Sequence, residues 1–357
     1  MGKLHTYKYN EDLFKKVTTL PGATNHGMVM VLDWSGSMSE NLSGTLTQMY
    51  QLIWFCRRTK IPFEVFAFSD RYGRIGRYYS VKKNEKYFKA GDLALDEFKL
   101  LNFFSNKMTI SEEMSMMAIL WMFAKRRYHP DHPYSPPNNL MLGGTPLNEA
   151  IIAMMDLLPK FKRETGVQKV NTIFLTDGAS NRMLGVYDYI FDKEENTHTK
   201  SITDLPHSYR NKSKIVLTDP VMNKTYEVDK YMTYDLLMIL KNRVPEMNVV
   251  GFFIAGTGRS GKVNKNTLYY LLPDNSREKV MEKIKFLNKN NYLALDQLGY
   301  DEYYILPGLN ALKIENEILN DELIGASKAK LKSAFGKMSK GKISNRQLLN
   351  KFVDMVA

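Results

Sequence analysis

The 357-residue chain contains a single cysteine, Cys56, and no long hydrophobic run. One cysteine excludes an intrachain disulfide framework and a cysteine-rich zinc ribbon, and it is typical of a reducing compartment. The longest apolar stretches, such as residues 247–256, are far shorter than the roughly 20 residues that span a bilayer. The N-terminus, MGKLHTYKYNEDLFKK, lacks the apolar segment of a signal peptide. These absences predict a cytoplasmic protein without a membrane partner.

Composition predicts a folded chain whose positive charge is concentrated near the C-terminus. Hydrophobic residues make up 44% and aromatic residues 12%, which excludes wholesale disorder. The net charge is +12, and residues 327–357 carry eight basic residues against one acidic residue, Asp354. Such a tail is a candidate for binding nucleic acid or an acidic partner. A solvated helix or frayed terminus is the commoner meaning, because only two aromatic residues, Phe335 and Phe352, interrupt the charges.

Short apolar runs alternate with helical patterns along the chain. Strands are expected at residues 28–32, 63–68, 171–176, 248–255 and 303–306. Helices are expected at residues 42–58, 111–127, 147–158, 233–243 and 277–288. This alternation predicts the α/β class, with a doubly wound, mainly parallel sheet flanked by helices.

Two stretches are too long to be simple connections, and we interpret both as insertions on a single core. Residues 71–140 include a proline-rich loop, HPDHPYSPPNN. Residues 185–230 include KIVLTDPVMNKTYEV, in which Asp219–Pro220 and Asn223–Lys224 have the turn chemistry of a hairpin.

Polar side chains that suit a metal ion follow the first expected strand, in the segment DWSGS. Ligands in open α/β sheets bind beyond the carboxyl ends of the strands, so the position is favourable. One carboxylate, Asp33, and two hydroxyls, Ser35 and Ser37, are hard oxygen ligands of the kind that Mg²⁺ or Mn²⁺ prefers. Gly36 is expected to allow a tight bend.

Two further motifs fall at the ends of other elements. GGTPL places Thr145 in the expected first turn of a helix, and TDG places Asp177 at the end of the third expected strand, near Asp33. An aspartate helix cap with a serine-rich turn and no metal is the alternative to a metal site. Trp34, inside the first motif, is compatible with two positions, exposed at the rim as an interface anchor or tucked beneath the loop.

The three motifs DxSGSM, GGTP and TDG, in this order, resemble a von Willebrand factor A domain with a metal-ion-dependent adhesion site. The resemblance covers residues 25–310, between an N-terminal extension at 1–24 and a basic helical tail at 311–357. It implies a metal shell with an open position that an acidic side chain of a protein partner fills. The residues that it implies for the shell are Asp33, Ser35, Ser37, Thr145 and Asp177.

A narrower resemblance is carried by NHGMVMVLDWSGSM, IPFEVFAFSD, LGGTPLNEAI and FLTDGASN. These segments look like the C-terminal domain of CobT-type cobaltochelatase subunits and of CobT-like proteins from large tailed phages, some of which are called peptidases. That family implies a MoxR-type AAA+ ATPase as partner and, for a phage protein, the host cytoplasm. The long N-terminal part and the acidic middle of bacterial CobT are not present here.

Other motifs do not support catalysis by this chain. GTGRSGK at residues 256–262 resembles a phosphate-binding loop, but Val263 stands where Ser or Thr coordinates Mg²⁺. His129 and His132 lie in HPDHP, whose prolines are incompatible with a zinc-protease helix. Cys56 lies on an apolar helical face and is expected to be a buried structural residue.

The sequence thus favours a metal-ion-dependent protein-interaction module that binds Mg²⁺ or Mn²⁺ and belongs to a larger assembly. The alternative is a CobT-like, non-catalytic subunit of an AAA+-driven metal chelatase or remodelling complex. In that case ATP hydrolysis by a second protein is coupled to the same site.

Overall fold

The computed structural model describes residues 25–308, apart from 71–88, 96–97, 126–137, 182–184, 193–196, 205–214, 229–231, 257–262, 264–270, 272–275, 291 and 297–298. Several features discussed above therefore lie outside the described residues. They are the N-terminal extension, the basic tail, the HPDHP loop and most of the loop that resembles a phosphate-binding motif.

A seven-stranded sheet with the order β11-β12-β10-β5-β1-β2-β4 forms the centre of the fold. Its five inner strands are parallel, and the edge strands β4 and β11 pair antiparallel with their neighbours. The strands are β1 (His26–Asp33), β2 (Phe63–Asp70), β4 (Phe98–Ser105), β5 (Lys169–Thr176), β10 (Met247–Ala255), β11 (Leu293–Leu295) and β12 (Glu302–Pro307).

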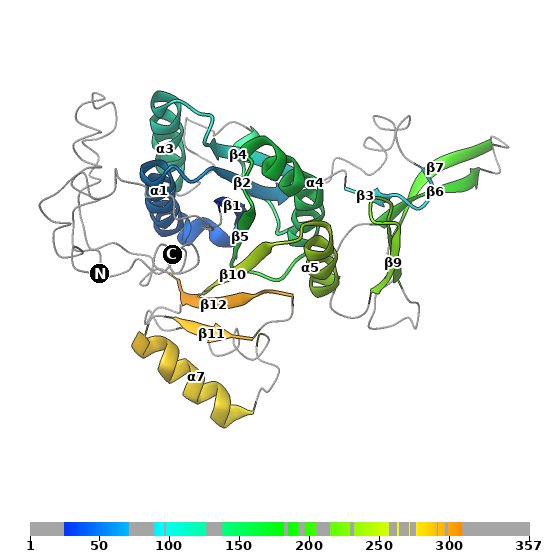
Figure 1. The fold of residues 1–357 in the computed structure, drawn as a ribbon. Helices are drawn as coiled ribbons and strands as arrows, with labels where there is room; N and C mark the ends of the chain where they lie inside the picture. The colour runs from blue at the N-terminus through cyan, green and yellow to red at the C-terminus, as the bar shows by residue number, and fades with distance from the viewer. Residues whose placement is uncertain are drawn as a thin grey trace, which may run out of the picture.

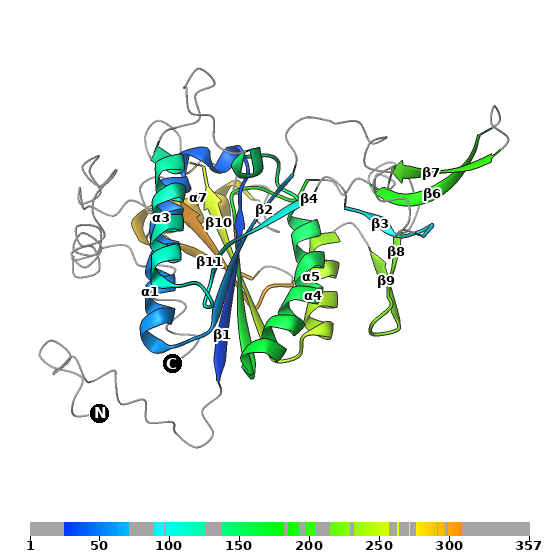
Figure 2. The same cartoon turned by 90° about the horizontal axis from the view of Figure 1, so that it is seen from above.

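Helices cover both faces of this sheet, which confirms the predicted doubly wound α/β fold (Figures 1 and 2). Helices α1 (Leu42–Thr59) and α3 (Ile110–Lys125) lie on one face, and α4 (Leu147–Thr165) and α5 (Met232–Arg243) lie on the other. Helix α7 (Arg277–Asn290) packs on β11 and β12. None of the described helices is long and apolar enough to cross a membrane.

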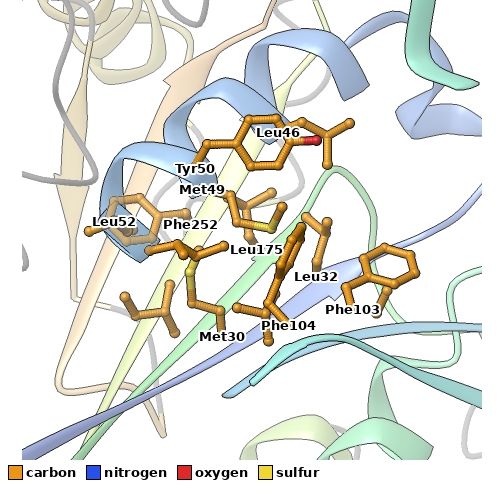
Figure 3. Packing of buried hydrophobic residues seen from close by; sticks show 14 of the residues in the cluster. Met30, Leu32, Leu46, Met49, Tyr50, Leu52, Phe103, Phe104, Leu175 and Phe252 are labelled. Atoms are coloured by element: carbon orange, nitrogen blue, oxygen red, sulfur yellow. The ribbon is translucent and has the colours of Figure 1, made fainter. Parts of the chain in front are cut away.

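The alternation of side chains along β1 divides the core between the two faces. Met28, Met30 and Leu32 pack with α1 and α3, whereas Val29 and Val31 pack with α4 and α5. Figure 3 shows the first of these layers, in which side chains of α1 cover those of β1, β5 and β10. A strand that is buried on both faces needs apolar side chains at consecutive positions, which explains the continuous apolar run at residues 28–32.

The two long stretches have different roles in the fold. Residues 71–140 contribute β4 to the edge of the main sheet and α3 to one of its helical layers, as well as the short strand β3 (Leu93–Ala94). Within 185–230, strands β6 (Gly185–Asp192) and β7 (Thr197–Asp204) pair with each other, and β3 extends this small sheet. Figure 2 shows it beyond α4 and α5, away from the main sheet.

The predicted hairpin is present as β8 (Ile215–Asp219) and β9 (Lys224–Val228). Asp219 organises its turn, because one carboxylate oxygen accepts the backbone N–H groups of Val221 and Met222. The same buried carboxylate receives two hydrogen bonds of 2.6 Å from the guanidinium of Arg243, at the end of α5. This bidentate pair holds the hairpin against α5.

The strand order reverses at the boundary between β1 and β5. From β1 the chain passes through α1 to β2 on one side, whereas β5 and then β10 lie on the other side. At such a switch point the loops after neighbouring strands diverge and leave a crevice at the carboxyl edge of the sheet. Asp33 ends β1 and Asp177 follows β5, so both border this point.

Candidate metal centre

Three separate segments bring the predicted residues to this edge of the sheet. Asp33 is the last residue of β1, Ser35 lies in the turn that follows, and Ser37 is the first residue of a short 3₁₀ helix, η3 (Ser37–Glu40). The hydroxyl of Ser37 donates to Asp177 Oδ1 over 2.7 Å, and the Ser35 and Ser37 hydroxyl oxygens are 3.0 Å apart. Three of the five predicted residues, Ser35, Ser37 and Asp177, are therefore joined in one polar cluster, in which Ser37 is exposed. The buried Asp33 adjoins this cluster, because the negative charge of Asp177 acts on its carboxylate.

Thr145 joins this cluster through the loop that precedes α4. Helix α4 begins at Leu147, so Thr145 lies just before the helix and not in its first turn. An added Cβ on Gly178, the residue after Asp177, would lie 3.8 Å from the Thr145 hydroxyl oxygen. The Thr145 carbonyl also accepts the backbone N–H of Asn181 over 2.7 Å. The hydrogen bond attaches Thr145 to the segment after β5, and the Gly178 geometry places the Thr145 hydroxyl near the residue that follows Asp177.

The Asp33 carboxylate is fully buried, and only one of its two oxygens has a hydrogen-bond partner within the described residues. Its Oδ2 atom accepts a hydrogen bond of 2.7 Å from the hydroxyl of Thr176, whereas Oδ1 has no hydrogen-bond partner within the described residues. Burial, together with the negative charge of Asp177, raises the pKa of Asp33 to about 7. The pKa of Asp177 is also raised, mainly by burial. A negative charge at Asp33 is therefore costly without a nearby cation.

This donor set fits a hard divalent cation. The described ion pairs do not supply a Lys, Arg or His partner to Asp33 or Asp177. Carboxylate and hydroxyl oxygens are ligands that Mg²⁺ and Mn²⁺ accept. In the described part of the chain, no three His, Cys, Asp or Glu side chains group to hold a metal ion. The predicted shell contains only two such residues, and its other three donors are hydroxyls.

The backbone connects the first two loops of the cluster directly. The N–H of Gly36 donates to the Gly143 carbonyl over 2.8 Å, and the N–H of Gly143 donates to the Trp34 carbonyl. Gly36 itself has φ −61° and ψ −34°, a right-handed conformation open to any residue, and an added Cβ would meet only ordinary contacts. The expectation that the bend uses the conformational freedom of Gly36 is therefore wrong.

Trp34 is tucked beneath the loop and is not an interface anchor. Its side chain is fully buried, and its indole N–H donates to the Leu140 carbonyl over 2.9 Å. The ring packs edge-on against Phe103 and stacks on Phe123. The tryptophan thus packs beneath the loop that carries Ser35 and Ser37, and the alternative of an exposed rim position is wrong.

Cys56 is a buried residue of α1, as predicted. Its thiol lies 3.8 Å from the Met28 sulfur, and burial raises its pKa far above the usual range. A thiol that stays protonated in an apolar core is unsuited to nucleophilic chemistry.

Three polar residues near the cluster were not predicted as part of the site: Asp70, Glu149 and Thr176. Thr176 orients Asp33 and also accepts the N–H of Gly178. Asp70 ends β2 as Asp33 ends β1, and its Oδ1 accepts the N–H of Gly144 over 2.5 Å. Glu149 lies in the first turn of α4, four residues after Thr145. A search for acidic residues at every strand end would have found Asp70.

Thr176 gives a test of how far Asp33 depends on its orientation. We expect Thr176→Val to weaken Mn²⁺ binding by about 10- to 100-fold, because a ligand that loses its outer hydrogen bond is poorly positioned. Thr172→Val is the matched control, since the Thr172 hydroxyl lies on the same strand, is buried and has no hydrogen-bond partner within the described residues. Calorimetric titration of both variants measures the effect, and equal affinities would contradict the assigned role of Thr176.

Glu149 gives a prediction about pH and stability. Its side chain is 6% exposed, and burial, with a smaller contribution from the charge of Asp70, raises its pKa from 4.5 to about 7. The folded protein therefore holds this proton more tightly than the unfolded chain does. The contribution of protonated Glu149 to the free energy of unfolding is fully present below pH 4.5 and is lost as the pH rises through about 7. The charged form of Glu149 destabilises the metal-free fold.

In a chelator at pH 8.5, Glu149→Gln should therefore raise the free energy of unfolding by about 2–3 kcal/mol. The difference from the wild type should disappear near pH 4.5, where both side chains are neutral. Denaturant unfolding at the two pH values measures it. A variant that is equally stabilised at both pH values would show that the cause is packing and not charge.

No protein-family model matches the chain, and no curated protein sequence is significantly similar to it. Among solved structures, the chain is similar to the pilus adhesin SpaC of Lactobacillus rhamnosus GG in its open conformation, with 14% identity and a TM-score of 0.36. It is also similar to proximal thread matrix protein 1 of the mussel byssus, with 14% identity and a TM-score of 0.29. These matches cover 77% and 75% of this chain.

A third similar structure is the type V pili tip protein Mfa5 of Porphyromonas gingivalis, with 12% identity, 72% of this chain covered and a TM-score of 0.29. The chain covers 33% of the SpaC chain, 46% of the byssus protein and 48% of Mfa5. It therefore spans a third to a half of the length of these structures.

Proposed function

We propose that the chain is a metal-ion-dependent protein-interaction module that binds Mg²⁺ or Mn²⁺ through Asp33, Ser35, Ser37, Thr145 and Asp177. The observation that carries the proposal is the buried Asp33 carboxylate with one unpartnered oxygen, in a cluster of hydroxyls and a second carboxylate. A cation that binds these oxygens offsets the cost of burying the charge of Asp33.

The roles of the residues follow from their positions. Asp33 supplies the buried negative charge, and the hydroxyls of Ser35 and Ser37 supply neutral oxygens. Thr145 and Asp177 lie on the other two loops and complete the shell directly or through water. When bound, the ion supplies a Lewis-acidic position that accepts a carboxylate oxygen.

The partner that this chemistry selects is a protein with an exposed Asp or Glu. Without the ion, the carboxylates of Asp33 and Asp177 repel a third carboxylate, since no described Lys, Arg or His forms an ion pair with either of them. With the ion, the same approach is attractive, so binding depends on the metal. A MoxR-type AAA+ ATPase, as the CobT resemblance implies, stays a prediction about the identity of that partner.

Affinity capture with the full chain tests the proposal. Capture is carried out in Mg²⁺, in EDTA and in EDTA followed by Mn²⁺, with bound proteins identified by mass spectrometry. We expect a partner that is lost in EDTA, returns with Mn²⁺ and loses affinity when its contacting Glu or Asp becomes Gln or Asn. Thr172→Val serves as the control bait and should capture the same partner. A partner retained fully in EDTA would contradict the proposal.

A further inference from the structure

The loop that carries Thr145 is pressed against the end of β2. Asp70 is the last residue of that strand, and its Oδ1 atom accepts the backbone N–H of Gly144 over 2.5 Å. A Cβ on Gly143 would overlap this carboxylate and would lie 2.5 Å from the Asp70 carbonyl oxygen. A Cβ on Gly144 would lie 2.5 Å from Asp70 Oδ2. Two residues without side chains therefore allow the loop to approach the end of β2 this closely.

The backbone on both sides of Thr145 has a fixed partner. On the N-terminal side, the N–H of Gly144 donates to Asp70. On the C-terminal side, the carbonyl of Thr145 accepts the N–H of Asn181, in the segment after β5, over 2.7 Å. Thr145 is itself buried. Hydrogen bonds to the ends of two different strands therefore set the position of this residue.

Two other side chains hold the start of the same loop by its carbonyl groups. Lys99 of β4 donates from Nζ to the Met141 carbonyl over 2.9 Å, and the indole N–H of Trp34 donates to the Leu140 carbonyl. Of these three side chains, Asp70 acts nearest to Thr145, because it binds the residue directly before it. Loss of the Asp70 carboxylate should therefore displace Thr145 most directly.

We propose that Asp70 is a positioning residue for Thr145, which it places in the predicted metal shell by holding the N–H of Gly144. This inference rests on the proposed function and extends it to a residue that supports one of the ligands. Outer hydrogen-bond partners orient metal ligands, and their loss typically weakens metal binding by about 10- to 100-fold. The role requires a hydrogen-bond acceptor and not a charge, so Asp70→Asn should preserve it.

Titration of the full chain with Mn²⁺ by calorimetry tests the inference on five chains: the wild type, Asp70→Ala, Asp70→Asn, Thr145→Val and the double variant of Asp70→Ala with Thr145→Val. We expect Asp70→Ala to weaken Mn²⁺ binding by about 10- to 100-fold, and Asp70→Asn to retain most of the wild-type affinity. On the Thr145→Val background, Asp70→Ala should have no further effect, because the ligand that it positions is gone. Asp156→Ala is the control, since Asp156 is an exposed aspartate of α4.

Hydrogen exchange in EDTA follows the same contact without any metal. Exchange over residues 141–146 should be faster in Asp70→Ala than in the wild type or in Asp70→Asn, because the Gly144 N–H loses its acceptor. Exchange along α4 should be unchanged, which distinguishes a local release of the loop from a general loss of stability. Circular dichroism and thermal unfolding establish that each variant is folded.

The results distinguish this inference from the proposed function. Equal Mn²⁺ affinities of the wild type and folded Asp70→Ala would overturn the inference and leave the proposed function standing. The same loss with and without the Thr145 hydroxyl would also overturn it, because Asp70 would then act by another route. So would a loss in Asp70→Asn as large as in Asp70→Ala, which would assign the effect to charge. A wild-type chain that binds no Mn²⁺ would contradict the proposed function and this inference together.

Discussion

Replacing Asp33 by alanine is expected to weaken Mg²⁺ and Mn²⁺ binding at the predicted shell by more than about 100-fold, since even the outer partners of a metal ligand contribute 10- to 100-fold. Asp33 is the one charged residue at the floor of the cluster, and its Oδ1 atom has no competing hydrogen bond within the described residues. The hydroxyls that remain are neutral, and Asp177 alone leaves the predicted shell with one carboxylate in place of two. Isothermal titration with Mn²⁺ measures the loss.

The fold should survive this substitution. Burial raises the pKa of Asp33 to about 7, so the charged carboxylate does not stabilise the metal-free protein at pH 8. Asp33→Asn keeps the side-chain volume and an acceptor for Thr176, and should melt at or above the wild-type temperature in EDTA. Asp156→Ala is the control, because Asp156 is exposed and lies on α4 away from the cluster. Unchanged metal affinity in folded Asp33→Ala would contradict the assignment of the metal site.

The main sheet could be predicted because its inner strands have a strong local signal. Parallel strands buried on both faces are nearly continuous apolar runs, and β1 and β10 have this form, whereas β2 and β5 are apolar runs with single polar interruptions. Strand β4 was assigned to an insertion instead, because it is an edge strand with mixed exposure in a stretch with long irregular segments. Strand β11 has only three residues and depends on its pairing with β12.

The candidate site could be predicted only where its residues lie within short motifs. Asp33, Ser35 and Ser37 share one turn, and the motifs around Thr145 and Asp177 are equally local. The burial of Trp34 depends on Phe103, Phe123 and the carbonyl of Leu140, all of them remote in the sequence. No local pattern encodes such contacts, so the orientation of this ring could not be settled before the fold was known.

Gly36 and Gly144 show the same limit of local sequence patterns. Substitution of Gly144 is also the second change for which we expect a large effect. Gly36, which was expected to allow a tight bend, has an ordinary backbone conformation and room for a Cβ. A Cβ on Gly144 has no such room, because it would overlap the Asp70 carboxylate and the Asn181 carboxamide. The need for a glycine at this position therefore arises from the approach of the end of β2, and not from a turn.

Gly144→Ala should consequently displace Asp70, break its hydrogen bond to the backbone and move the adjoining Thr145. We expect a loss of about 1–3 kcal/mol in the free energy of unfolding, the usual cost of overpacking, together with weaker Mn²⁺ binding. Gly36→Ala is the matched control in the same cluster and should change the free energy of unfolding by less than about 0.5 kcal/mol. Denaturant unfolding and Mn²⁺ titration of the pair measure both effects. If Gly36→Ala proved the more damaging substitution, the contact between β2 and the Thr145 loop could not be what holds the site together.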